Sequence, residues 1–283
     1  MKIAITGATG QLGQFVIQHL LNKTQAENIV ALVRNVDKAE NLTAKGIEVR
    51  HFDYDTPTTL VPALQGIDKI LLISANEIGR RTPQHKAVID AAVEAKIPYI
   101  AYTSLLRADS SPLGLAQEHR ETEQLIKENG LSYTFLRNNW YSENYLVGLA
   151  HNIETGILYG AAQDALISAA PRTDYAEAAV NVLLSDGHKN KTYELASSTS
   201  FTLETLAKTI SDLSNKTVVY TNLSAEDYTQ GLLQAGLPEG LVNVVVEADV
   251  EAVNGALLSD RKDLENLLNR PTTSLENTIK SLL

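Results

Sequence analysis

Residues 1–16 read M-K-I-A-I-T-G-A-T-G-Q-L-G-Q-F-V, in which a short apolar run leads into three glycines spaced three residues apart. The run at 2–6 predicts a buried strand, and the sequence from Gln11 onward predicts an amphipathic helix, so the glycines occupy the turn between them. A phosphate that approaches such a turn needs bare backbone N–H groups, and the start of a helix adds partial positive charge. We therefore expect a dinucleotide to bind at this turn.

Each glycine has its own expected role. Gly7 allows the sharp turn, Gly10 the close approach of a pyrophosphate, and Gly13 the close packing of helix on strand. The spacing G-x-x-G-x-x-G differs from the G-x-G-x-x-G fingerprint in its first interval. The alternative is a glycine-rich turn that serves packing alone. The place of the motif, between the first strand and the first helix, favours the dinucleotide.

Short β-rich runs alternate with helical periods through the first half of the chain. The expected strands lie at 2–6, 29–33, 48–53, 69–74, 99–104 and 133–137. The expected helices lie between them, at 11–22, 36–44, 58–64, 82–95 and 115–129. This alternation predicts right-handed crossovers and an α/β fold, a Rossmann-like doubly wound parallel sheet that helices cover on both faces.

After about residue 140 the rhythm becomes irregular. A helix at 173–184 and the strand K-T-Y-E-L-A are expected to return to the sheet, the strand as its seventh. A helix at 203–213, a strand T-V-V-Y-T and a mostly helical tail follow, and P-T-T-S-L-E predicts a capped helix start. We expect 1–150, with 173–196 returning to it, to form an NADP-binding domain. The segments 151–172 and 197–283 are expected to form a smaller mixed α/β lobe that binds the substrate.

The composition excludes several classes of protein. A formal net charge of −10 argues against a general binder of nucleic acid or of an acidic membrane. Without cysteine there is no disulfide or thiolate nucleophile, and the six histidines lack ligand spacing, so no metal is expected. No signal peptide or membrane span is visible, which makes the cytoplasm the expected location. The oligomeric state is left open, with a homodimer as one alternative.

The end of the second expected strand indicates which dinucleotide binds. The sequence has Arg34 there, where an acidic residue would accept from the adenosine ribose and repel a 2′-phosphate. A guanidinium pairs with a phosphate through two parallel N–H bonds, so NADP(H) is favoured over NAD(H), against the alternative of a solvated arginine. Asp53 accepts from the adenine amino group or caps its strand end, and both alternatives stay open. Ser74–Asn76 follow the fourth strand and are expected to line the cofactor.

Six longer stretches carry a family resemblance: G-A-T-G-Q-L-G, V-R-N, L-L-I-S, A-Y-T-S-L-L, S-P-L-G-L-A-Q-E-H and L-R-N-N-W-Y-S-E-N-Y. Together they resemble the NmrA-like atypical short-chain dehydrogenase/reductase family, and within it above all the bacterial NADPH-dependent quinone reductases. The triphenylmethane dye reductases are more distantly similar. The resemblance extends from residue 1 into the P-T-T-S-L-E-N-T segment, so it covers nearly the whole chain.

The resemblance implies site residues at the matching positions. The pyrophosphate would be held by Gly7, Ala8, Thr9, Gly10, Gln11, Leu12 and Gly13, and the 2′-phosphate by Arg34. The cofactor would be lined by Ser74, Ala75, Asn76, Asn138, Asn139, Trp140, Tyr141, Ser142 and Glu143, with Ala170 approaching through its backbone. Asn139 stands where the close relatives are expected to have glycine, and we expect its amide to narrow the nicotinamide pocket.

The reaction is indicated by a missing pair of residues. Ordinary short-chain dehydrogenases use a Tyr with a Lys four residues later, and none of the eleven tyrosines has that partner. Alcohol–ketone chemistry needs such a proton donor at the carbonyl oxygen. A quinone yields a stabilised aromatic anion that takes its proton from water, so an enzyme for it mainly stacks the ring and excludes bulk water. We expect NADPH-dependent two-electron reduction of quinones or similar planar electron-poor acceptors.

Candidate pocket residues follow the fifth and sixth expected strands: Tyr102, Thr103, Ser104, Trp140 and Tyr141. Trp140 either stacks on the quinone or packs in the core, and Tyr141 and Tyr145 fit the buried face of one helix. His119, the one weak catalytic candidate, either donates a proton or forms a surface pair with Glu123.

Several alternatives stay open at this point. The segment 118–123 is expected to be a solvated helix face, and 79–83 is either a mobile lid or the start of a helix. The alternatives for function are a reductase of another acceptor, such as a triphenylmethane dye, and a dinucleotide-sensing regulator without turnover.

Overall fold

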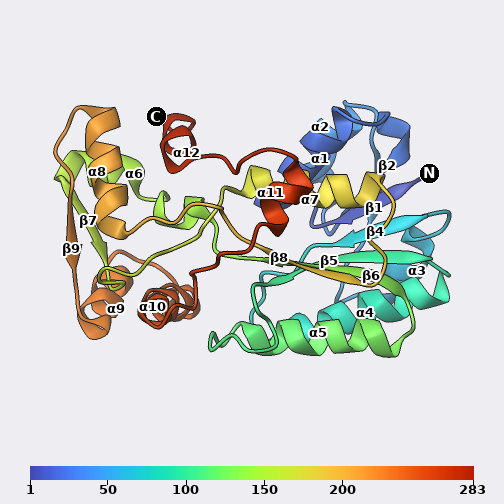
Figure 1. The fold of residues 1–283 in the computed structure, drawn as a ribbon. Coiled ribbons are helices and arrows are strands. Elements are labelled where there is room, and N and C mark those ends of the chain that lie inside the picture. The colour runs from blue at the N-terminus through green and yellow to red at the C-terminus, as the bar shows by residue number, and fades with distance from the viewer. The chain divides into compact units, whose positions relative to one another are not determined.

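The computed structural model describes residues 1–283, which form two compact units. Unit 1 comprises 1–109, 117–138 and 172–194, and unit 2 comprises 110–116, 139–171 and 195–283. The chain therefore leaves unit 1 briefly at 110–116 and again after its sixth strand, and it returns to unit 1 for one further helix and strand. Figure 1 labels the elements of both units.

Unit 1 is built on the expected sheet. Its strands are β1 (Ile3–Thr6), β2 (Ile29–Val33), β3 (Glu48–His51), β4 (Lys69–Leu72), β5 (Tyr99–Leu105), β6 (Ser132–Asn138) and β8 (Lys191–Leu195). They follow the order β3-β2-β1-β4-β5-β6-β8, and the pairs from β3 to β6 are parallel. The predicted α/β sheet is confirmed, with the K-T-Y-E-L strand as its seventh member. The strand order reverses between β1 and β4, where ligands bind in open sheets of this kind.

Helices cover the sheet on both faces. Figure 1 shows α1 (Gln11–Leu21) and α7 (Arg172–Leu184) on one face, and α4 (Arg81–Glu94) and α5 (Ala116–Glu128) on the other. Shorter elements connect the strands: η1 (Ala26–Asn28), η2 (Val36–Ala39), α2 (Glu40–Thr43), η3 (Pro57–Thr59) and α3 (Leu60–Ala63). The expected helices at 36–44 and 58–64 are therefore each a 3₁₀ turn followed by a single α turn. Residues 79–83 lead into α4, as one of the two alternatives for this stretch expects.

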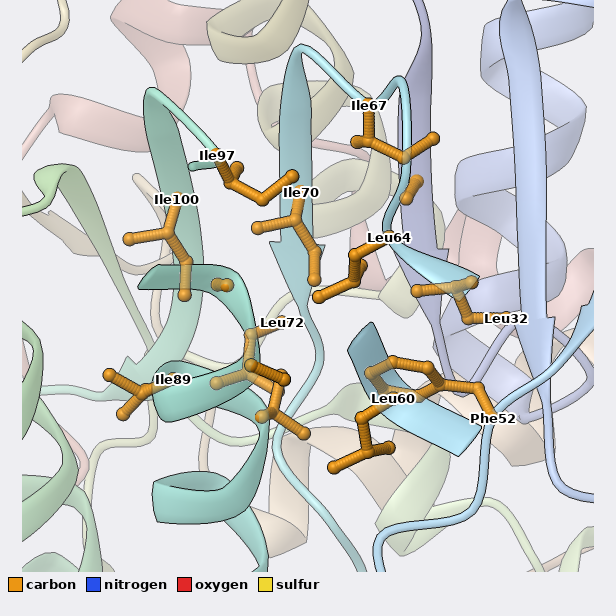
Figure 2. Packing of buried hydrophobic residues seen from close by; sticks show 14 of the residues in the cluster. Leu32, Phe52, Leu60, Leu64, Ile67, Ile70, Leu72, Ile89, Ile97 and Ile100 are labelled. Atoms are coloured by element: carbon orange, nitrogen blue, oxygen red, sulfur yellow. The ribbon is translucent and has the colours of Figure 1, made fainter. Parts of the chain in front are cut away.

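The core beneath α3 and α4 explains the continuous apolar runs in the strands. Figure 2 shows β-strand side chains packed against residues of the helices and connecting loops. The residues that it labels are all nearly inaccessible to water: Leu32, Phe52, Leu60, Leu64, Ile67, Ile70, Leu72, Ile89, Ile97 and Ile100. Removing each large apolar side chain from water stabilises the fold by roughly 1.5–3 kcal/mol. This core fixes the strand ends that form the candidate site.

Unit 2 contains a small parallel sheet of β7 (Ile157–Gly160) and β9 (Val219–Asn222). Its helical elements are η4 (Ser142–Tyr145), α6 (Leu149–Thr155), α8 (Leu203–Ser214), α9 (Ala225–Gln234), α10 (Glu239–Val253), α11 (Asp263–Leu268) and α12 (Leu275–Lys280). Ser274 caps α12 by accepting a hydrogen bond from the backbone N–H of Asn277, which confirms the helix start predicted from P-T-T-S-L-E. No helix in either unit has the length and apolar character needed to cross a membrane.

Candidate functional site

The glycine turn after β1 has the geometry that its spacing predicts. Gly7 adopts a positive φ of 57°, and its carbonyl accepts a hydrogen bond from Gly10 N at 2.9 Å. A Cβ atom on Gly13 would lie 2.2 Å from the Gly7 oxygen and 2.8 Å from the Ala8 Cα. Gly7 therefore makes the sharp turn, and Gly13 lets α1 pack directly against it.

The same turn fits a pyrophosphate. No side chain caps α1, and the first N–H groups of a helix lack partners within the helix. Gly7, Gly10 and Gln11 are exposed at this point, while Ala8 and Leu12 are buried beneath them. Backbone donors at the positive end of the helix macrodipole are the groups that bind a phosphate without a basic side chain.

The exit of β4 is held by three side chains. Successive backbone N–H groups at 73–75 donate to Thr6 Oγ1, Thr103 Oγ1 and His85 Nε2, each at 2.9 Å. The carbonyl of Ala75 accepts from Arg81 Nε. The candidate segment Ser74–Asn76 is thus fixed to β5 and α4, and the preceding residue Ile73 to β1, although only the position of the segment after a strand indicated a role.

His85 is a buried residue beside the candidate segment that the sequence reasoning missed. Because Nε2 accepts from Ala75 N–H, the ring proton resides on Nδ1 and is donated to Thr122 Oγ1 at 2.9 Å. Thr122 donates in turn to the backbone oxygen of Glu118. Burial, with a smaller contribution from the positive charge of Arg81, lowers the pKa of His85 to about 3. A neutral ring of fixed tautomer therefore holds the segment.

Arg34 is exposed at the end of β2, as expected, and is also paired. Its side chain is 70% exposed, and Nη1 lies 3.2 Å from Glu77 Oε1. The guanidinium retains N–H groups that face solvent and fit a phosphate. Glu77 carried no signal in the sequence, because it reaches Arg34 from the loop after β4.

Asp53 serves the turn after β3. Its carboxylate accepts from the backbone N–H of Asp55 at 3.1 Å and from the Thr56 hydroxyl at 3.3 Å. Of the two alternatives left open, the strand-end cap is the one that these contacts support.

Tyr102 and His119 lie in the core of unit 1. Tyr102 is fully buried, and its hydroxyl pairs with His119 Nδ1 at 2.7 Å. Burial is the main cause that lowers the pKa of His119 well below its usual value, and Arg81 adds to it. Tyr102 therefore packs in the core of unit 1 rather than on an exposed pocket wall. His119 pairs with Tyr102, which corrects the alternative of a surface pair with Glu123.

The expected solvated face at 118–123 is also wrong in part: Arg120 is exposed, whereas His119, Thr122 and Glu123 are buried. Glu123 is buried and accepts two hydrogen bonds from Arg137, at 2.9 and 2.8 Å, and one from Ser104 at 2.6 Å. Arg137 donates further to Glu194 at 2.8 Å. Ser104, a predicted pocket residue, is committed to this buried ion cluster, because a buried carboxylate needs such partners.

In unit 2 the structure brings two predicted cofactor segments together. Tyr141 and Ala170 form a parallel β-bridge, and Ser142 N donates to the Ala170 oxygen at 3.0 Å. Asn139 Nδ2 donates to the carbonyls of Ser168 and Leu257, at 3.0 and 2.9 Å. The Asn139 amide is therefore buried in the framework of unit 2, which does not support the expectation that it narrows the nicotinamide pocket.

The aromatic residues between 140 and 145 are more buried than a surface that stacks on a quinone requires. Trp140 is 8% exposed, which supports the core alternative over a stacking platform. Tyr141 is half-buried, and Tyr145 ends the 3₁₀ helix η4, so the two do not share an α-helical face.

The Tyr145 hydroxyl donates to Asp249 Oδ1 at 3.2 Å. Burial raises the pKa of Asp249 to about 6.

A cavity of about 450 Å³ opens within unit 2 beside Ser142 and Ala169. Most of the other side chains that line it carry hydroxyl groups: Ser197, Thr199, Ser200, Thr205, Thr209, Thr273 and Ser274. Phe201 supplies an apolar wall. The cavity adjoins the 139–143 segment and has room for a small molecule with hydrogen-bonding groups.

Known proteins resemble this chain over its whole length. The model of the NmrA-like family matches residues 1–269. Quinone oxidoreductase 2 of Escherichia coli is 50% identical over 280 residues, which are 99% of this chain and 98% of that protein. NAD(P)H azoreductase of Xenophilus azovorans is 27% identical and covers 87% of this chain and 85% of its own. The family resemblance inferred from the six sequence stretches is confirmed.

Solved structures agree with these relatives. The crystal structure of the E. coli NADPH-dependent quinone oxidoreductase QOR2 complexed with NADPH matches with a TM-score of 0.95 over 99% of each chain, at 50% identity. The triphenylmethane reductase of Citrobacter sp. complexed with NADP(H) matches with a TM-score of 0.94 over the full length of both chains, at 37% identity.

Proposed function

Because the chain belongs to the NmrA-like family, we propose that it is an NADPH-dependent oxidoreductase that reduces quinones by two electrons. The observation that carries the proposal is the full-length similarity to the E. coli quinone oxidoreductase solved with NADPH. The glycine turn, with Gly13 packed against the Gly7 carbonyl, agrees with it independently of that similarity. The dye-reductase and regulator alternatives are not favoured.

Three segments of unit 1 are proposed to contact the cofactor. In unit 1, residues 7–13 hold the pyrophosphate, Arg34 binds the 2′-phosphate and Ser74–Asn76 line the site, with Asn138 at the end of β6. In unit 2, residues 139–143 and the backbone of Ala170 are proposed as cofactor contacts from the family resemblance. When bound, NADPH supplies the hydride that reduces the quinone. The bridged 139–143 and Ala170 segments support this assignment, since they present backbone groups side by side.

In this proposal the side chains of unit 1 position the cofactor, and none of them donates a proton to the quinone. Tyr102 and His119 are buried and paired with each other, and Ser104 donates to a buried carboxylate. The overall change is quinone, NADPH and one proton going to hydroquinone and NADP⁺. Water supplies that proton, because the hydroquinone anion is stable enough to leave before it is protonated. Of the five predicted pocket residues, Tyr141 is the half-buried one and is proposed to contact the acceptor.

The proposal also concerns location and partners. We place the protein in the cytoplasm, with NADPH and a small quinone as its ligands and without nucleic acid among its partners. The acidic net charge agrees with the last point.

The test is the loss of NADPH absorbance by purified protein with a panel of quinones, beside matched NADH reactions. Rapid loss that depends on the quinone and is faster with NADPH supports the reductase. Tight NADPH binding without loss for any acceptor would support the regulator instead.

A further inference from the structure

Glu77 lies in the loop after β4 and contacts three polar side chains. Its Oε1 atom is 3.2 Å from Arg34 Nη1. Its Oε2 atom accepts from Arg80 Nη1 at 2.9 Å and from Gln84 Nε2 at 3.2 Å. The carboxylate therefore joins the proposed phosphate-binding arginine to the start of α4.

The position of this carboxylate is fixed from more than one side. Arg80 Nη2 also donates to Asp55 Oδ1 at 2.8 Å, so Arg80 bridges two acidic residues. Gln84, which is 5% exposed, holds the same oxygen as Arg80. Glu77 itself is only 32% exposed, whereas Arg34 is 70% exposed. Arg34 is thus the more exposed partner of the pair, and Glu77 is the one that further hydrogen bonds hold in place.

A ligand phosphate that binds Arg34 meets this anchored negative charge. A phosphate monoester carries close to two negative charges at neutral pH, and Glu77 lies within one ion-pair distance of the guanidinium. The carboxylate also orders Arg34, but exposed pairs of this kind contribute little. The ligand phosphate and the Glu77 carboxylate are both negative and lie beside the same guanidinium. Their repulsion therefore outweighs the benefit of ordering Arg34.

We propose that Glu77 is a specificity-determining residue that limits the affinity of this chain for the 2′-phosphate of NADPH. The proposal rests on the proposed function and on the role given there to Arg34. In dinucleotide sites an acidic residue at the end of the second strand selects against the 2′-phosphate. Here the acidic group reaches the same place from the loop after β4, so it weakens a preference that Arg34 creates. NADPH and NADP⁺ carry the same 2′-phosphate, so both bind less tightly than they would without Glu77.

The test is a fluorescence titration of NADPH and NADH with five proteins: wild type, Glu77→Gln, Arg34→Ala, the Glu77→Gln/Arg34→Ala double variant and the control Asp55→Asn. Glu77→Gln is expected to tighten NADPH binding by roughly three- to tenfold and to change NADH by less than about twofold. The gain should vanish in the Arg34→Ala background. Asp55→Asn is the matched control, since it removes one carboxylate from the same network without touching Arg34, and it should change NADPH binding by less than Glu77→Gln.

The outcomes separate this inference from the function beneath it. If Arg34→Ala weakens NADPH but Glu77→Gln leaves it unchanged or weakens it, the inference is overturned and the cofactor assignment stands. An equal gain for Glu77→Gln and Asp55→Asn also overturns it, because a general change of charge then accounts for the effect. If Arg34→Ala has no effect on NADPH, the 2′-phosphate role of Arg34 fails and the inference fails with it.

Discussion

The backbone N–H of Ala75 donates to Nε2 of His85 at 2.9 Å, and this bond ties the candidate cofactor segment to the buried core of unit 1. Ala75 follows β4 and His85 lies inside α4, so the contact depends on how the helix packs against the end of the strand. The contact requires a neutral imidazole, because a protonated ring has no acceptor. It links the protonation of one buried side chain to the shape of the proposed site.

Replacing His85 tests this link. His85→Leu keeps an apolar body of similar size but leaves Ala75 N–H without its acceptor, and an unsatisfied buried group costs about 1–3 kcal/mol. We expect NADPH and NADH binding to weaken together, by about tenfold. His85→Gln restores an acceptor at this distance from the backbone and should recover most of the loss. Equal affinities for wild type and both variants, measured by titration, would rule out the positioning role.

Gly13→Ala tests the packing of α1 on the glycine turn. The new Cβ would lie 2.2 Å from a backbone carbonyl, so the helix must move away from the turn. Overpacking of this kind typically costs about 1–3 kcal/mol, and we expect weaker binding of both cofactors in addition. Gly231→Ala is the matched control, because nothing lies within 4 Å of that position in α9. It should stabilise the protein by roughly 0.5–1 kcal/mol, as thermal unfolding can show.

Arg34→Asp tests the choice of cofactor. The change removes a charge-assisted contact to the 2′-phosphate and adds a carboxylate that repels it. NADPH affinity is expected to fall by about a hundredfold, while NADH affinity changes by less than about threefold. The NADH titration serves as the internal control for folding. Equal losses for the two cofactors would contradict the role assigned to Arg34.

Asp249→Asn tests the buried carboxylate of unit 2. Its pKa is raised from 3.8 to about 6, so the folded state binds a proton over this range and the unfolded state does not. The group therefore contributes stability below about pH 4 that is lost as the pH rises through about 6. The backbone N–H of Ala161 donates to Asp249 Oδ2 at 2.8 Å, and an amide oxygen at this position can still accept that bond without the charge.

Urea titrations at several pH values give the free energy of unfolding. They show whether the contribution of Asp249 to stability falls as the pH rises. Relative to wild type, Asp249→Asn should gain about 2–3 kcal/mol between pH 4 and pH 7. Asp90→Asn, at a carboxylate on the surface of α4, should show no comparable trend. A difference in the free energy of unfolding between Asp249→Asn and wild type that stays constant from pH 4 to pH 7 would contradict this prediction.

Much of unit 1 was predictable because its signals are local. The apolar runs of β1, β2 and β4 are continuous since both faces of the sheet are covered, and the glycine spacing is set by a single turn. Arg34 was predictable for the same reason, because its position depends only on the end of β2.

The polar interior of unit 1 was not predictable in this way. His85 meets Ala75 and Thr122 only after β4, α4 and α5 have assembled, so no short window of sequence contains the arrangement. The buried face of α5 did leave a signal: positions 116, 119, 122, 123 and 126 recur at helical spacing. Three of these residues are polar, and a pattern based on hydrophobicity alone therefore assigned them to solvent.

The most direct test of the central claim is an anaerobic measurement of products, in which NADPH, a small benzoquinone and the purified protein are mixed and both reactions are followed. The account predicts one hydroquinone formed for each NADPH consumed, a rate slowed by deuterium at the transferred position, and no oxygen uptake when the reaction is repeated in air. Oxygen uptake that accompanies quinone-dependent NADPH loss would show one-electron transfer. That result, or NADPH that stays bound and unconsumed, would contradict the account.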